Sequence, residues 1–228
     1  MTCEDANVLP GAEYYRDLAA LYRFYSSAFL YELTPEQIEL LATADMGADI
    51  ADDDTSDEAQ GYRWMRAYLA HRGPDARRDL AVDYARVFLG AGVFEGDTAV
   101  PYESVYLSEE GILMQEPRDE VVACYRKNGF AVRGDMNVPE DHAGFELEFC
   151  ALLCDRAAEA LEAGDSEALR GVLGEQSGFI GQHLLSWLPM LQARVDTWAE
   201  LRFYPALVRI VIGTLHENLA ANAELAAE

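Results

Sequence analysis

Basic residues are scarce in this sequence, which has 17 Lys and Arg against 41 Asp and Glu and a formal net charge of -24. A surface with that charge repels nucleic acids and anionic membranes, so we expect no nucleic-acid partner and no direct membrane insertion. Long apolar runs are missing too, because no stretch approaches the roughly 20 residues that span a bilayer. The charge favours cationic partners. The alternative is that the acidity only maintains solubility or reflects a salty cytoplasm.

Cysteine is also rare, and the four residues are Cys3, Cys124, Cys150 and Cys154. They form no CxxC pair and no dense framework of the kind found in secreted, disulfide-bonded proteins. The N-terminus has no basic region followed by an apolar stretch, so no signal peptide is visible. We therefore expect reduced thiols and a cytoplasmic location.

No alternating strand pattern lasts along the chain, whereas apolar residues recur at helical spacing. Between Tyr14 and Leu30 they form one stripe, which predicts a helix with one buried face. Thr34-Pro35-Glu36-Gln37 combines a hydroxyl cap, a proline at the first helical position and a capping-box glutamine, and so predicts the next helix start. The fold class predicted is all-α.

Further helices are predicted between these signals and the end of the chain. They cover about 57–71, 75–89, 117–129 and 139–163, then stretches from 166 to 219 with breaks near Gly174, Pro189 and Pro205. The sequence thus predicts a single compact helical domain, residues 1–228, of about nine or ten helices. A division into two lobes hinged near 90–103 or 129–139 is kept open.

One irregular stretch interrupts the helices. The glycine-rich segment from Gly90 to Gly96 and the aromatic segment 100–107 predict a loop that lies on a groove. The glycines do not match a phosphate-binding loop, because the Gly-Lys-Ser/Thr end is missing and a helix precedes them. Aromatic residues around this loop could receive an apolar peptide segment, and core filling is the alternative for each of them. They are Tyr84, Phe88, Phe94, Tyr102 and Tyr106.

The stretch NVPEDHAGFELEF, residues 137–149, reads first as a helix start. If the helix begins at Pro139, Glu140 and Asp141 lie in its first turn, where the helix dipole favours negative charge. The same dipole opposes an imidazolium, so we expect His142 to be neutral and to make one specific hydrogen bond. A structural role and a binding role both stay open for His142.

A metal site is a lesser alternative. His142, Glu146, Cys150 and Cys154 are each four residues apart and would line one helical face. A single helix rarely completes a zinc shell, so burial of both cysteines as small apolar residues is the favoured interpretation. No GxSxG, HExxH or nucleotide motif is present, and we expect neither enzymatic activity nor a cofactor.

Four segments in order resemble the TorD/DmsD/NarJ family of cytoplasmic redox-enzyme maturation chaperones. They are DYARVFLG (83–90), PYESVYL (101–107), PEDHAGFELEF (139–149) and FIGQHLLSWLP (179–189). The resemblance spans about 14–219 and implies an all-helical, non-catalytic protein, either a monomer or a domain-swapped dimer. The resemblance implies that the partner is the apo precursor of a molybdenum-cofactor oxidoreductase. The chaperone would bind the N-terminal twin-arginine signal peptide of this precursor before export. A NarJ-like assembly factor for a non-exported molybdoenzyme subunit is the alternative.

The resemblance also implies a peptide-binding region. It carries over directly to Asp141 and His142, with Pro139 and Glu140 beside them. By motif it extends to Tyr84, Val87, Phe88, Tyr102, Ser104 and Tyr106. We expect Asp141 and nearby acids to contact the arginines, His142 and Glu140 to fix the register, and the aromatic residues to take the apolar part.

Overall fold

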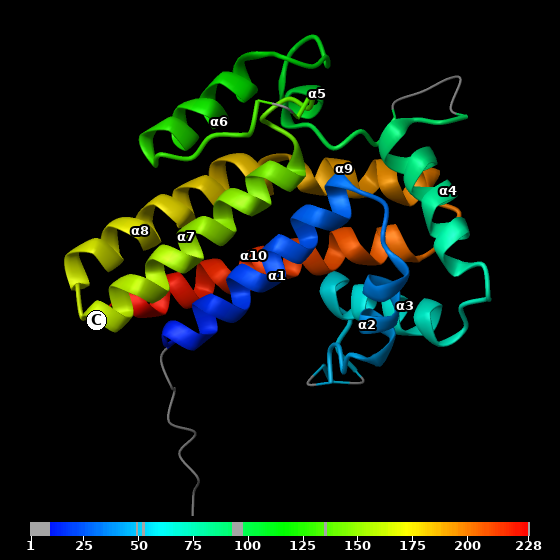
Figure 1. Ribbon diagram of the computed structural model, residues 1–228, viewed down its shortest axis with the longest axis horizontal. Coiled ribbons are helices and arrows are strands. Elements are labelled where there is room, and N and C mark those ends of the chain that lie inside the picture. Colours follow the sequence, from blue (N-terminus) through cyan, green and yellow to red (C-terminus); the bar gives the residue numbers. More distant parts are fainter. Residues whose placement is uncertain (1–9, 49, 52, 93–97, 135, 228) are drawn as a thin grey trace, which may run out of the picture.

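The computed structural model describes residues 10–48, 50–51, 53–92, 98–134 and 136–227. This part of the chain forms ten α-helices, one short π-helical segment and no strand, which confirms the predicted all-α class (Figure 1). Cys3, Phe94 and part of the predicted 90–96 loop lie outside the described residues. The elements are α1 (Ala12–Leu30), α2 (Pro35–Thr43), α3 (Asp57–Ala70), α4 (Ala76–Leu89), α5 (Glu103–Leu107), α6 (Glu116–Lys127), α7 (Ala143–Ala163), α8 (Ser166–Phe179), η1 (Ile180–Leu184), α9 (Leu185–Trp198) and α10 (Phe203–Ala226).

Strong local signals set the helix ends that the sequence predicts well. The Thr34 side chain accepts a hydrogen bond from the Gln37 backbone N–H, and the Gln37 side chain accepts one from the Thr34 backbone N–H. This reciprocal capping box begins α2 as predicted. Gly164 ends α7 with a φ of 66°, a left-handed conformation that favours glycine.

The breaks predicted at Gly174 and Pro189 are wrong. Helix α8 runs through Gly174, and α9 contains Pro189. The proline follows the π-helical segment η1 closely, where backbone hydrogen bonding already departs from the α pattern. Pro205 lies in the first turn of α10, where no backbone N–H is needed, so the real break is just before it at 199–202.

Two segments differ from prediction because they pair with each other. The helix predicted from Pro139 begins at Ala143, and the predicted 100–107 loop contains helix α5. Tyr102 and His142 form an isolated antiparallel bridge. The flanking hydrogen bonds run from the Glu103 N–H to the Asp141 carbonyl at 3.0 Å and from the Ala143 N–H to the Pro101 carbonyl at 2.9 Å. This long-range pairing uses backbone groups that a helix starting at Pro139 would need.

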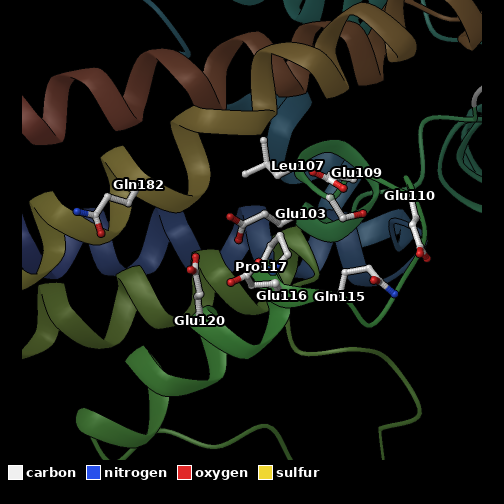
Figure 2. A pocket seen from close by; sticks show the side chains of 10 residues that line it. Glu103, Leu107, Glu109, Glu110, Gln115, Glu116, Pro117, Glu120 and Gln182 are labelled. Atoms are coloured by element: carbon white, nitrogen blue, oxygen red, sulfur yellow. The ribbon is translucent and has the colours of Figure 1, made fainter.

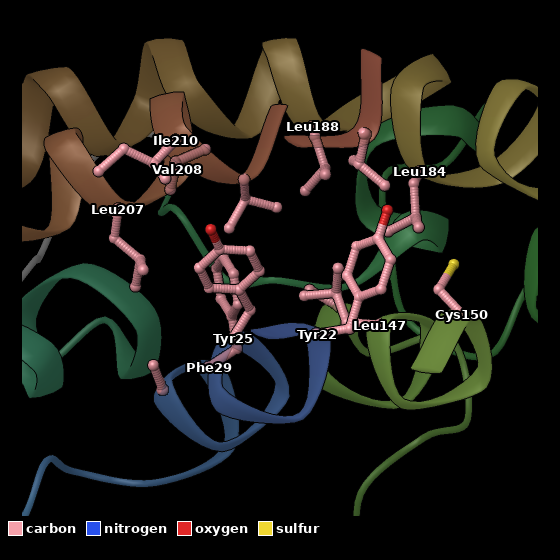
Figure 3. Packing of buried hydrophobic residues seen from close by; sticks show 14 of the residues in the cluster. Tyr22, Tyr25, Phe29, Leu147, Cys150, Leu184, Leu188, Leu207, Val208 and Ile210 are labelled. Atoms are coloured by element: carbon pink, nitrogen blue, oxygen red, sulfur yellow. The ribbon is translucent and has the colours of Figure 1, made fainter. Parts of the chain in front are cut away.

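One apolar core receives side chains from α1 through α10. Its centre lies where α1 packs along α7, with α9 and α10 covering the other side (Figures 1 and 3). Gly144 lets α1 and α7 approach closely, because a Cβ atom at this position would lie 2.5 Å from Leu30 Cγ. Cys150 and Cys154 are free thiols buried in this core, as predicted.

A row of polar contacts runs through the core between α1 and α10. Three tyrosines of α1 are buried, and each hydroxyl meets a polar side chain of α10. The pairs are Tyr15 with Asn222 at 2.8 Å, Tyr22 with Asn218 at 3.0 Å and Tyr25 with Thr214 at 3.1 Å. Every buried hydroxyl of this row is therefore satisfied, which avoids the cost of an unpaired polar group.

Within the described residues, no helix combines the length and apolar character needed to cross a bilayer. The hinge predicted near 90–103 or 129–139 stays a prediction, and residues 93–97 and 135 of these ranges lie outside the description.

Candidate functional site

Asp141 joins two segments that are distant in sequence. Its side chain is buried, and its Oδ2 accepts hydrogen bonds from the Ser104 backbone N–H at 2.9 Å and from the Ser104 hydroxyl. Ser104 lies in the first turn of α5, whose N–H groups have no partner within the helix. Asp141 thus caps α5, whereas the sequence predicted a place in the first turn of its own helix.

His142 is the N-cap of α7. Its Nδ1 accepts a hydrogen bond of 3.0 Å from the Gly144 backbone N–H, and its ring meets the Tyr102 ring edge-on with the centroids 4.8 Å apart. Burial lowers the pKa of His142 to about 3, so the side chain is neutral near pH 7. The neutral state agrees with the sequence prediction. The predicted specific hydrogen bond is also present, and it makes His142 the cap of α7.

Replacing His142 by asparagine should make the stability of the protein less sensitive to acid. Asparagine also caps helices but does not titrate. In the wild type, the unfolded imidazole takes up a proton near pH 6.5 while the folded one stays neutral down to about pH 3, so stability falls as the pH drops. Between about pH 7.5 and pH 5, we expect the free energy of unfolding of the wild type to fall by about 2 kcal/mol more than that of His142→Asn. Urea unfolding at each pH measures this difference. Parallel pH profiles for the two proteins would contradict this assignment.

Several other predicted residues gather around this junction. Ser104 is buried, whereas Pro139, Glu140, Tyr102 and Tyr106 are partly exposed. Glu140 pairs with Arg118 at 2.7 Å, and this hydrogen bond to the guanidinium holds the pKa of Glu140 below its usual range. The structure therefore brings the predicted residues of 101–107 and 139–142 into one region.

The predicted residues of α4 belong to the core. Tyr84 donates a hydrogen bond of 2.9 Å to the Phe29 carbonyl, and the Phe88 and Phe29 rings lie 5.3 Å apart. Val87 is fully buried beside them. In this conformation a peptide cannot reach these side chains. Contact between a peptide and Tyr84, Val87 or Phe88 stays a prediction, and so does contact between a peptide and Asp141 or His142.

A buried polar cluster lies behind α5. The Glu103 carboxylate has both oxygens 3.1 Å from Nδ1 of His183, and Glu146 lies close enough for the two carboxyl groups to interact. Trp187 donates a hydrogen bond of 3.2 Å to Glu146. Burial, with the nearby charges of Glu103 and Asp141, holds the pKa of Glu146 well above its usual range, so Glu146 is a neutral acid that can donate to Glu103.

His183 and Cys124 had no visible partner in the sequence, and the structure supplies one for each. Besides Glu103, His183 contacts the Cys124 sulfur, which lies 3.8 Å from its Nε2. These partners are 80 and 59 residues away along the chain, beyond the reach of any local spacing. Burial raises the pKa of the Cys124 thiol, so it stays protonated and poorly nucleophilic.

Glu103 also forms part of an acidic cavity of about 460 Å³ between α5, the start of α6 and η1. Figure 2 shows glutamates reaching this space from α5, α6 and the turn between them, with Gln182 of η1 on another side. None of its described lining residues is basic, and five are glutamates: Glu103, Glu109, Glu110, Glu116 and Glu120. Such a cavity suits a cationic group, because carboxylates bind guanidinium and ammonium groups through charge-assisted hydrogen bonds.

Sequence reasoning missed this cavity, since no carboxylate arrangement stood out among 41 acids. A partial signal exists. Glu116 and Glu120 are four residues apart on α6 and share one face, and Glu109-Glu110 precede them in a short turn. The missing information is spatial, because α5 and η1 complete the cavity from other parts of the chain.

The alternative metal site is not assembled in the part of the chain that the structure describes. No three His, Cys, Asp or Glu side chains there come close enough together to hold a metal ion. His142 caps α7, Glu146 accepts from Trp187, and Cys154 accepts from the Gln176 side chain at 3.0 Å.

Comparison with known proteins agrees with the family resemblance. Residues 52–193 match the family model described as nitrate reductase delta subunit. The Chaperone protein TorD of Vibrio cholerae serotype O1 (strain ATCC 39315 / El Tor Inaba N16961) is 29% identical over 203 residues, which cover 88% of this chain and 89% of the relative. The Chaperone protein TorD of Vibrio vulnificus (strain YJ016) is 30% identical over 198 residues, or 85% of this chain and 89% of the relative.

These relatives are named as chaperones, which confirms the prediction of a non-enzymatic protein. The matched 52–193 region contains α5, α6, the described lining residues of the acidic cavity and the 139–149 motif. The chain therefore belongs to the nitrate reductase delta subunit family, with TorD chaperones among its relatives.

Proposed function

We propose that this protein is a cytoplasmic redox-enzyme maturation chaperone. It binds the N-terminal twin-arginine signal peptide of an apo molybdenum-cofactor oxidoreductase precursor and assists maturation before export. Membership in a family with chaperone relatives supports the general role. The single observation that carries the peptide assignment is the acidic cavity between α5, α6 and η1.

The cavity has the charge that an arginine pair requires. Its five glutamates come from α5, α6 and the turn between them, and none of its described lining residues is basic. A guanidinium group is planar and presents several N–H donors, so it can bind two carboxylates at once. The net charge of -24 also draws a cationic segment toward the protein and speeds its association.

Asp141 and His142 act on this cavity through the backbone. Asp141 caps α5, and α5 begins with Glu103 at the base of the cavity. His142 caps α7 and packs on Tyr102, immediately before Glu103. We assign them a positioning role, because the Asp141 side chain is fully buried and His142 is almost so, and an arginine could reach Asp141 only if the residues that cover it moved. The peptide can contact four partly exposed residues of the same region, which are Tyr102, Tyr106, Pro139 and Glu140.

Calorimetry with a synthetic peptide tests this function. The peptide is acetylated and carries an adjacent arginine pair followed by a short apolar stretch; its matched partner has two glutamines in place of the arginines. We expect the glutamine peptide to bind about 100-fold more weakly, because each guanidinium makes hydrogen bonds to charged groups worth about 1.5–3 kcal/mol. Failure of the arginine peptide to bind would refute the proposed function.

A NarJ-like assembly factor is the second candidate, favoured by the description of the matching family model as nitrate reductase delta subunit. Such a protein would recognise a molybdoenzyme subunit that is not exported, and it would have no need of an arginine pair. Equal affinity for the arginine and glutamine peptides would favour this candidate over the first.

A further inference from the structure

A second, larger cavity lies on the other side of the turn that joins α5 to α6. Its volume is about 730 Å³. Its apolar wall consists of Val100, Val105, Ile112 and Leu113, and Arg194 is the basic residue among its described lining residues. Ile112 and Leu113 are 50% and 40% exposed, and both project from a segment without regular helix. Two large apolar side chains left in solvent side by side are typical of a surface that a partner covers.

The two cavities share a wall. Ser108, Glu109 and Glu110 line both, so the turn from Ser108 to Gly111 separates the acidic cavity from one that has an apolar wall. The Gly111 N–H donates to the Ser108 carbonyl at 3.3 Å and to the Ser108 hydroxyl at 3.1 Å, which fixes this turn. A ligand lying across the turn would place a cationic group on one side and an apolar group on the other.

Met114 follows Leu113 directly in the chain. It is 57% exposed and has a φ of 64°, a left-handed conformation that is uncommon for residues other than glycine. Such a conformation costs free energy and persists only when its surroundings enforce it. An exposed methionine is well suited to a binding surface, because its flexible thioether adapts to apolar partners of different shape.

We propose that the apolar segment following the arginine pair binds in this second cavity, against Val100, Val105, Ile112 and Leu113, with Met114 at its rim. This inference rests on the proposed function and gives the peptide a direction: the arginines lie on the α6 side of the Ser108–Gly111 turn and the apolar residues on the Val100 side. Continuity with the acidic cavity selects the occupant. Because Ser108, Glu109 and Glu110 line both cavities, a peptide whose arginines lie in the first places the residues that follow them at the apolar wall of the second.

Paired variants of the full chain test the apolar site by calorimetry with two peptides. One peptide carries the arginine pair and an apolar stretch, and the other carries the same pair followed by serine and glycine. The double variant Ile112→Ser with Leu113→Ser should bind the apolar peptide about tenfold more weakly and the serine-glycine peptide as the wild type does. The control is Leu40→Ser with Leu89→Ser, which removes two leucines that are 64% and 65% exposed elsewhere. The control should bind both peptides normally.

Each other outcome overturns a defined part of the account. Normal binding of the apolar peptide by the Ile112/Leu113 variant would overturn the apolar site while the proposed function stands. An equal loss with both peptides, or the same loss in the control, would also overturn it, because the effect would not depend on apolar contact. If the wild type binds neither peptide, the proposed function fails and the apolar site fails with it.

Discussion

Replacing Glu109, Glu116 and Glu120 together by glutamine lowers the affinity for the arginine-pair peptide by about 30-fold. Each of these glutamates lines the acidic cavity and is exposed to solvent. An exposed ion pair contributes about 0.5–1 kcal/mol, so three together contribute about 2 kcal/mol, which corresponds to about 30-fold. Because these charges are solvated, the loss should shrink as the salt concentration rises. Calorimetric titration at two salt concentrations measures both effects.

A control with the same net charge separates local from general attraction. Glu159, Glu167 and Glu224 are exposed and do not line the cavity. Their replacement by glutamine changes the net charge from -24 to -21, since -24 + 3 = -21, as does the cavity variant. We expect this control to bind the peptide nearly as well as the wild type. Equal losses in the two variants would show that only the overall acidity attracts the peptide.

Truncating Trp187 to alanine should produce the largest loss of stability. Trp187 is fully buried, donates its Nε1–H to Glu146 and stacks on Tyr106 with the ring centroids 5.3 Å apart. The cavity left by a Trp→Ala change costs about 3–5 kcal/mol. For a chain of this size, that loss lowers Tm by about 10 °C. Urea unfolding and differential scanning calorimetry measure the two quantities.

Two further variants separate the contributions to this loss of stability. One keeps the ring at position 187, and the other serves as a control on the same helix. Trp187→Phe keeps an aromatic ring but removes the donor to Glu146, and we expect a loss of about 1–2 kcal/mol. Met190→Ala lies on the same helix but removes a side chain that is 40% exposed, so the loss should stay below about 1 kcal/mol. If Trp187→Ala unfolds at the same urea concentration as Met190→Ala, the packing described beneath α5 is wrong.

Most of the fold could be predicted because most helix ends carry local signals. Thr34 and Gln37 form their capping box within four residues, and Gly164 ends α7 by its own conformational freedom. Pro189 misled the prediction, because the effect of a proline depends on the backbone before it, and the π-helical segment η1 is not visible in the sequence.

The candidate site was harder to predict because its order comes from contacts between distant segments. Asp141 reads as a first-turn residue of the helix after Pro139, yet its carboxylate caps a helix 37 residues earlier. The sequence predicts a neutral His142 with one specific hydrogen bond, but it does not show that this bond caps α7. Local spacing identified the stretch but could not show which backbone groups Asp141 and His142 would cap.

The acidic cavity illustrates the same limit at the level of charge. Composition predicts a cationic partner from 41 acids against 17 basic residues, but it cannot say where the partner binds. Only the packing of α5, α6 and η1 selects five glutamates from the rest and places them around one space. Glu103 is the clearest case, since it appears in the PYESVYL motif with nothing to mark it as the base of a cavity.

A double-mutant cycle tests most directly whether this cavity receives the arginine pair. Wild-type protein and the Glu109/Glu116/Glu120→Gln variant are each titrated by calorimetry with the arginine peptide and the glutamine peptide at one salt concentration. If the cavity binds the arginines, the variant should discriminate between the peptides about 30-fold less than the wild type does. If the variant discriminates between them as strongly as the wild type, the arginines bind elsewhere and the account is contradicted.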